Sequence, residues 1–160
     1  MQSRGSFATN IDVAGGATLK LGAIGGFGAT GNGTSSSGKA ITVQGTVELN
    51  GMEGCNAYTL AGGTLQNTGA AIGTGQRQTC ALTLTADSTV KAGSDFGLIG
   101  SGYAATTLNL GGHTLTKTGD AKFWLYNTTV SGGGKIKIDA GSVYAYSSLS
   151  ATSTAFEIAE

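Results

Sequence analysis

Two short segments carry alternating aromatic side chains that suit recognition of a carbohydrate or a protein. Trp124 and Tyr126 flank one residue, and Tyr144 and Tyr146 repeat this pattern 20 residues later. Flat rings with polar tips pack well against sugar rings and protein partners. If the residue between the two aromatics points inward in both segments, the four rings form one outward ladder. These four residues are the candidate ligand-binding site, and a ladder that only stiffens the sheet is the alternative.

The two cysteines, Cys55 and Cys80, are 25 residues apart. This is about one coil of the repeat described below, so we expect them on adjacent coils. Parallel neighbours lie about 4.8 Å apart, which a disulfide accepts. A disulfide closing a loop of about 25 residues contributes roughly 3.5 kcal/mol in the chain-entropy model. Two reduced, buried cysteines are the alternative. Two Cys and one distant His do not form a zinc set, so we expect no metal and no cofactor.

Residues that suit catalysis are sparse. His113 is the only histidine, and it lies in a Gly-Gly-His-Thr corner with no nucleophile near it in the sequence. This favours a solvated corner residue over a catalytic base. Enzymes that cleave polysaccharides need clustered carboxylates, for which Asp120 and Asp139 on neighbouring coils are the best pair. A solvated charge cluster explains them as well. We therefore expect no catalytic residue and no enzyme activity, with a polysaccharide lyase or glycosidase-like fragment as the alternative.

A repeated unit must position these residues. It consists of a short alternating strand, a tight Gly-rich corner and a second alternating strand, and it occurs six times. The first apolar residue of the second strand falls at positions 19, 47, 65, 90, 115 and 136, an average step of about 23 residues. A seventh unit is expected to begin at Phe156-Glu157-Ile158. A third, weaker strand closes each coil, with candidates at 96–99, 123–126 and 143–146.

Stacking the units places like residues over one another. Side chains alternate between the two faces of a strand, so the apolar columns point inward and the intervening polar columns, which include Glu48, point outward. A single coil cannot bury its inward face, but a stack of coils makes each inward column continuous. The expected inward stack of the first strand is Val13, Val43, Leu60, Leu84, Leu110 and Val130.

The sequence therefore predicts an all-β fold, a right-handed single-stranded parallel β-helix (a solenoid). It has about six coils of roughly 23 residues, with three strands per coil. Residues 1–160 are expected to form a single β-helix segment, excised from a longer repeat protein. A β-sandwich is the structural alternative. The solenoid is favoured because the corner recurs at the same place in every unit.

The C-terminal half resembles a known bacterial repeat. The segments Leu115–Gly119 (LTKTG), Phe123–Asn127 (FWLYN) and Val130–Gly141 (VSGGGKIKIDAG) are similar to the autotransporter-associated β-strand repeat. Asp-Ala-Gly stands where that family has Asn-Ala-Gly, and Lys122 and Trp124 replace residues that are small or Thr-like in the family. The resemblance implies a right-handed β-helical passenger segment that is exported to the cell exterior and has no enzyme activity.

Composition narrows the range of partners. The chain has 29 glycines, no proline and a formal net charge of zero. Zero net charge disfavours nucleic acid, because neutralising phosphates needs a basic surface. No apolar run approaches the roughly 20 residues of a membrane-spanning helix, and residues 1–6 lack the apolar stretch of a signal peptide.

Taken with the resemblance, these features predict a structural or adhesive segment of an exported bacterial surface protein. We expect it outside the cell or on the cell surface, as a rigid rod that presents loops and an aromatic face. The expected partners are a carbohydrate or a surface protein of a host or neighbouring cell. Open coil ends also invite self-association, so a self-assembling repeat module is a further alternative.

Overall fold

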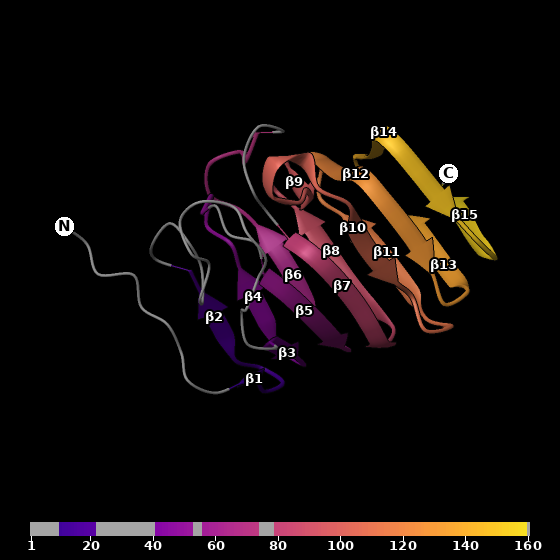
Figure 1. The fold of residues 1–160 in the computed structure, drawn as a ribbon. Helices are drawn as coiled ribbons and strands as arrows, with labels where there is room; N and C mark the ends of the chain where they lie inside the picture. Colours follow the sequence, from indigo (N-terminus) through magenta and orange to yellow (C-terminus); the bar gives the residue numbers. More distant parts are fainter. Residues whose placement is uncertain (1–9, 22–40, 53–55, 74–78, 160) are drawn as a thin grey trace.

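The chain is a stack of parallel β-strands. The computed structural model describes residues 10–21, 41–52, 56–73 and 79–159. The regular structure of these residues is β-strand throughout, apart from one short 3₁₀-helix, η1 (Ser101–Tyr103). The strands form a β-solenoid of about five turns. The N-terminal strands lie at one end of the stack and the C-terminal strands at the other (Figure 1). The predicted all-β parallel solenoid is therefore confirmed as an architecture.

Among the described residues, two parallel sheets form most of the wall, one of eight strands and one of seven. The first sheet runs in the order β1 (Ile11–Val13), β3 (Ile41–Val43), β5 (Asn56–Ala61), β7 (Thr79–Ala86), β10 (Thr106–Asn109), β12 (Lys122–Ser131) and β14 (Ser142–Ala151). The second runs in the order β2 (Thr18–Lys20), β4 (Thr46–Glu48), β6 (Thr64–Asn67), β8 (Ser88–Ala92), β11 (Thr114–Thr118), β13 (Gly134–Ile138) and β15 (Thr154–Ile158).

Alternating side chains fill the space between the sheets. β5 shows the pattern most clearly, because buried and half-buried residues alternate along its whole length. Val, Leu and Ile from both sheets point inward and are fully buried in the middle coils. Burial of each such side chain contributes roughly 1.5–3 kcal/mol. Since a single coil offers too little apolar surface for a core, this contribution depends on stacking.

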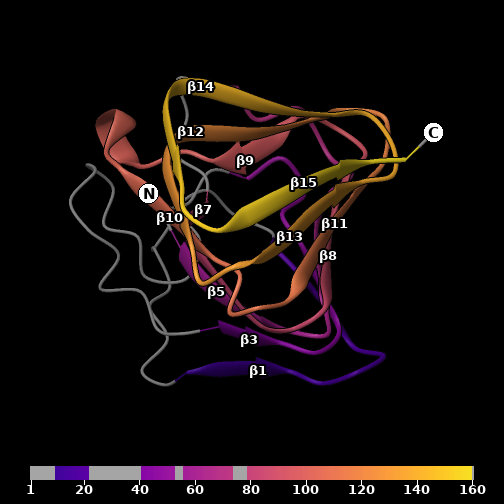
Figure 2. The same cartoon turned by 90° about the vertical axis from the view of Figure 1, so that its right-hand side faces the viewer.

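A third side closes the C-terminal coils. β9 (Phe96–Leu98) pairs with the first half of β12, and Phe96 lies beside Phe123. β12 and β14 are each ten residues long, and their mutual register shifts between Tyr126 and Thr128. Seen along the stack, β9, β12 and β14 run along one side, and β8, β11 and β13 lie on another (Figure 2). Of the weaker strands expected at 96–99, 123–126 and 143–146, the first is β9, which ends at Leu98, and the other two are the first halves of β12 and β14.

The inward stacks differ from the prediction by two residues in the later coils. Val13, Val43, Leu60 and Leu84 align as expected. In β12, however, Val130 lies beside Leu108 and not beside Leu110.

The second sheet shows a similar slip. Leu115 aligns with Ser88, and the partner of Val90 is Lys117. A slip of two residues keeps every side chain on the same face, so it conserves the pattern while changing the partners.

The expected seventh unit also has a different place. Residues 156–158 belong to β15, which pairs with β13 and so forms the second strand of its coil. The first strand of that coil is the end of β14, where Ala151 pairs with Val130. That stretch is rich in serine and has no apolar alternation, so the repeat pattern did not reveal it.

Candidate binding face

The four aromatic residues predicted from spacing lie in one patch on β12 and β14. Trp124 pairs with Tyr144, and Tyr126 with Tyr146, in the expected register. Leu125, between the two aromatics of β12, is fully buried and points inward. The rings of Tyr144 and Tyr146 are about half-exposed. The outward ladder expected from the 20-residue step is therefore present.

The rings of this patch contact one another closely. The centroids of Tyr126 and Tyr146 are 5.1 Å apart with an interplanar angle of 34°. Those of Trp124 and Tyr144 are 4.9 Å apart at 65°, an edge-to-face pair. Both arrangements are favourable for aromatic pairs, because the positive edge or offset face of one ring meets the negative face of the other. The ladder is therefore held in place by its own contacts.

A fifth aromatic residue extends the ladder and was not predicted from the sequence. Tyr103 ends η1, and its ring centroid lies 5.0 Å from that of Tyr126 at an angle of 33°. Asn127 Nδ2 donates a hydrogen bond to the Tyr103 carbonyl oxygen, which fixes this turn against the next coil. The 23-residue step from Tyr103 to Tyr126 was the available signal, but Tyr103 lies outside any alternating strand. We call these five residues the aromatic face.

Packed phenylalanines support the aromatic face from inside. The rings of Phe96 and Phe123 are buried, with centroids 5.2 Å apart in an edge-to-face contact. Outside, Lys122 Nζ lies 5.3 Å from the centre of the Trp124 ring, a cation–π contact. The indole N–H of Trp124 is buried without a hydrogen-bond partner. The face thus combines a rigid backing, one cation and flat rings.

Lys117 holds the corners that lead into the aromatic strands. Its side chain is fully buried, and its ammonium donates hydrogen bonds to the carbonyl oxygens of Thr118, Gly119 and Ala140 at 3.0, 2.6 and 2.8 Å. Burial lowers the pKa of the ammonium, and the carboxylates of Asp120 and Asp95 partly oppose this. The Gly119 corner precedes β12 and the Ala140 corner precedes β14. One buried cation therefore ties together the entry points of both strands.

The cysteine prediction is only partly covered by the described residues. Cys80 lies in β7 and is disulfide-bonded. Cys55 lies outside the described residues. The pairing of Cys55 with Cys80 therefore stays a prediction.

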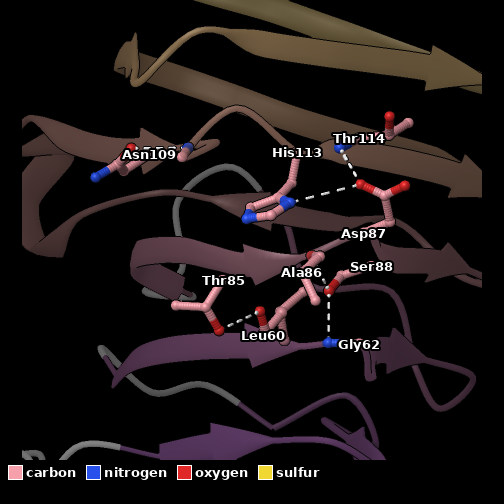
Figure 3. Close-up of polar contacts among 10 residues, drawn as sticks. Leu60, Gly62, Thr85, Ala86, Asp87, Ser88, Asn109, His113 and Thr114 are labelled. Atoms are coloured by element: carbon pink, nitrogen blue, oxygen red, sulfur yellow. Dashed lines mark hydrogen bonds and ion pairs between the residues drawn. The ribbon is translucent and has the colours of Figure 1, made fainter.

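His113 lies at a corner of the second sheet, where Figure 3 shows it beside Asp87. Its Nδ1 is 3.7 Å from Asp87 Oδ1, and the same oxygen accepts a 2.8 Å hydrogen bond from the Thr114 N–H. The nearby Ser88 hydroxyl donates to the Ala86 carbonyl oxygen and accepts from the Gly62 N–H. The hydroxyl proton is thus committed to a carbonyl and not to the imidazole. The side chains of Asp87 and Ser88 therefore hold backbone groups of this corner in place.

The acidic residues of the last coils form separate ion pairs. Lys137 Nζ is 2.9 Å from Asp139 Oδ1, and Lys135 Nζ is 2.7 Å from Glu157 Oε2. The hydrogen bond from Lys135 lowers the pKa of Glu157, and the one to Asp139 raises the pKa of Lys137. The lowered pKa of Glu157 is the opposite of what a glycosidase acid needs, which is a raised carboxyl pKa that retains the proton near neutral pH. The pairs fit a solvated charge cluster.

Within the part of the chain that the structure describes, no group of three or more His, Cys, Asp or Glu side chains gathers as a metal site. No helix among the described residues has the length and apolar character to cross a membrane. No family model, curated protein or solved structure matches this chain.

Proposed function

We propose that this chain is a rigid structural and adhesive rod that binds carbohydrate through its aromatic face. The carrying observation is the stack of five aromatic side chains on β12, β14 and η1, three of them about half-exposed over a buried backing. Flat rings at fixed spacing bind sugar rings with little loss of conformational entropy, because the rings are already ordered.

The edge-to-face pair is the proposed centre of sugar binding. Tyr126 and Tyr146 stack along the solenoid and so cover part of each other's faces. The 65° angle between Trp124 and Tyr144 turns one of these two rings away from the stacking direction. A sugar packs its C–H face on the half-exposed ring of Tyr144. It directs its hydroxyls toward Lys122, which is exposed at the start of β12.

The wider setting of the proposal comes from the sequence. The rod is a right-handed β-helix of about six coils of roughly 23 residues with three strands each. The right hand is supported by the strong preference of parallel strand connections for it. The similarity of 115–141 to autotransporter-associated repeats supports a place outside the cell or at a bacterial cell surface. The alternatives are recognition of a cell-surface protein and polysaccharide cleavage.

Tryptophan fluorescence tests the proposal directly, because Trp124 is the only tryptophan. Titration with pectin, alginate and mucin glycans is expected to change the emission saturably for at least one of them. Tyr144→Ala is expected to weaken that binding by about tenfold or more. Lys91→Ala, an exposed change on the second sheet, serves as the matched control and leaves binding unchanged.

Two results would overturn the proposal. Absence of saturable binding to every glycan, with the variants and the parent behaving alike, would remove carbohydrate as the ligand. Release of new reducing or unsaturated sugar ends on prolonged incubation would instead support the cleaving enzyme, which the rod proposal excludes.

A further inference from the structure

The C-terminal coil leaves inward-facing apolar side chains open. Phe156 and Ile158 of β15 are 46% and 74% exposed, and Leu149 of β14 is 36% exposed. Their register partners one coil earlier are better covered, since Ile136 beside Phe156 is 2% exposed and Ile138 beside Ile158 is half-buried. Among the described strands, β14 and β15 are the last of their sheets and each pairs along one edge only. The core therefore ends in an apolar surface.

Backbone groups at this end are also arranged to accept another strand. Ala159 N–H donates to the Ile138 carbonyl oxygen, and Thr152 N–H donates to the Val130 carbonyl oxygen. Residues alternate in a parallel strand between facing one neighbour and facing the other. The N–H and C=O groups of Phe156 and Ile158 therefore point to the open edge. Such an edge pairs readily with a further strand.

The N-terminal coil offers the matching edge. Thr46 N–H donates to the Ala17 carbonyl oxygen, and Leu21 N–H donates to the Glu48 carbonyl oxygen. By the same alternation, Thr18 and Lys20 direct their backbone groups away from β4. Among the described strands, β1 and β2 are the first of their sheets, so this edge and that of β14 and β15 lie at opposite ends of the stack (Figure 1).

We propose that a second copy of this chain docks head to tail, with its β1 and β2 against β14 and β15. This contact repeats the parallel junction that already joins every pair of coils. It covers Phe156 and Ile158 of β15 with the half-buried Leu19 of the arriving copy, and it places Ile11 of that copy over the end of β14. Contact between two C-terminal ends would instead run the strands antiparallel, a pattern that no described strand pair of this protein uses.

Complementary charges favour the same partner. Lys20 of the arriving copy and Glu157 both lie on the outer face at the junction and carry opposite charges. The protein already places Lys20 beside Glu48 and Lys137 beside Glu157 across neighbouring strands. Since a head-to-tail contact leaves a free end on each partner, it does not close and leads to linear assemblies.

Two end-blocked variants test this proposal by sedimentation or light scattering across a concentration series. Ile158→Lys places a charge on the C-terminal end and is expected to weaken association by about 10- to 100-fold. Thr18→Pro removes a free N–H from the N-terminal edge at the first residue of β2, where a strand tolerates proline. Ile158→Val and Thr18→Ser are the matched controls, and they associate like the parent chain.

Mixing the blocked variants gives the sharpest result. Each variant alone stays monomeric, but the mixture forms one-to-one pairs and nothing larger, because each supplies the end that the other lacks. Unchanged circular dichroism and Trp124 emission show that both variants are folded. Association of Thr18→Pro alone would indicate contact between C-terminal ends and overturn the proposal. A parent chain that stays monomeric at every concentration would overturn it too.

Discussion

Glu48 is a buried carboxylate that joins two coils through hydrogen bonds. Its Oε1 accepts hydrogen bonds from the N–H groups of Asn50 and Thr68, and its Oε2 accepts from the Thr68 hydroxyl and from Gln66 Nε2. Burial raises its pKa, but these four hydrogen bonds outweigh burial and hold the pKa below its ordinary value. The residue points outward as its column predicts, yet its neighbours cover it almost completely.

This arrangement makes part of the stability dependent on pH. Because the pKa of Glu48 is lower in the folded chain than in the unfolded chain, its contribution is complete above the unfolded value. It is lost as the pH falls through the folded pKa. We expect the free energy of unfolding, measured with urea at a series of pH values, to fall in acid.

Glu48→Gln should show a smaller acid loss than the parent and a free energy of unfolding lower by about 1–3 kcal/mol at neutral pH. The exposed change Asp12→Asn is the control. An acid loss that is the same in Glu48→Gln and in the parent would contradict this role of Glu48.

At the scale of elements, the bends in β12 and β14 set the shape of the C-terminal coils. Asn127 and Ser147 adopt left-handed backbone conformations with φ of 48° and 72°. Apart from asparagine and aspartate, L-residues rarely adopt this conformation, which costs about 1 kcal/mol. Asn127 offsets the cost, because its side chain bonds the Tyr103 carbonyl oxygen and the Ser148 hydroxyl.

Substitution by glycine should therefore change the free energy of unfolding differently at the two bends. Ser147→Gly is expected to raise the free energy of unfolding by about 0.5–1 kcal/mol, since glycine adopts positive φ without steric cost. Asn127→Gly should give no gain, because it also removes two side-chain hydrogen bonds. Urea unfolding of both variants checks this pair, and an equal gain in both would show that the side chain of Asn127 contributes nothing.

The sequence predicted the strands, their inward faces and the alignment of the aromatic pairs, because all three follow from alternation and a step of one coil. It did not predict the registers of Leu115 and Val130, since a slip of two residues preserves the alternation on which the prediction rests. The burial of Lys117 could not be predicted either, because it depends on carbonyl oxygens of two corners that only the fold brings together.

At the scale of the whole molecule, the two ends of the described stack differ from its middle. Strands β5 to β8 have paired neighbours on both sides and buried inward residues, whereas β14 and β15 have one paired edge each. Stability in stacked repeats depends on contacts between neighbours, so a coil with one neighbour opens more readily.

Amide hydrogen exchange is expected to be faster in β14 and β15 than in β5 to β8 when the chain is dilute. The difference should shrink at high concentration, because the proposed head-to-tail contact covers the open edge. Uniform exchange along the whole stack at low concentration would contradict the unequal stability of the coils.

The order of the strands also determines how the rod responds to tension. Every strand runs across the long axis, so a pull along that axis is carried by the hydrogen bonds between coils, one junction after another. Junctions in series part at the weakest one. Glu48 and Lys117 reinforce two inner junctions with side-chain bonds between coils. Under load, the folded part of the rod therefore loses whole coils from an end, while its middle stays folded.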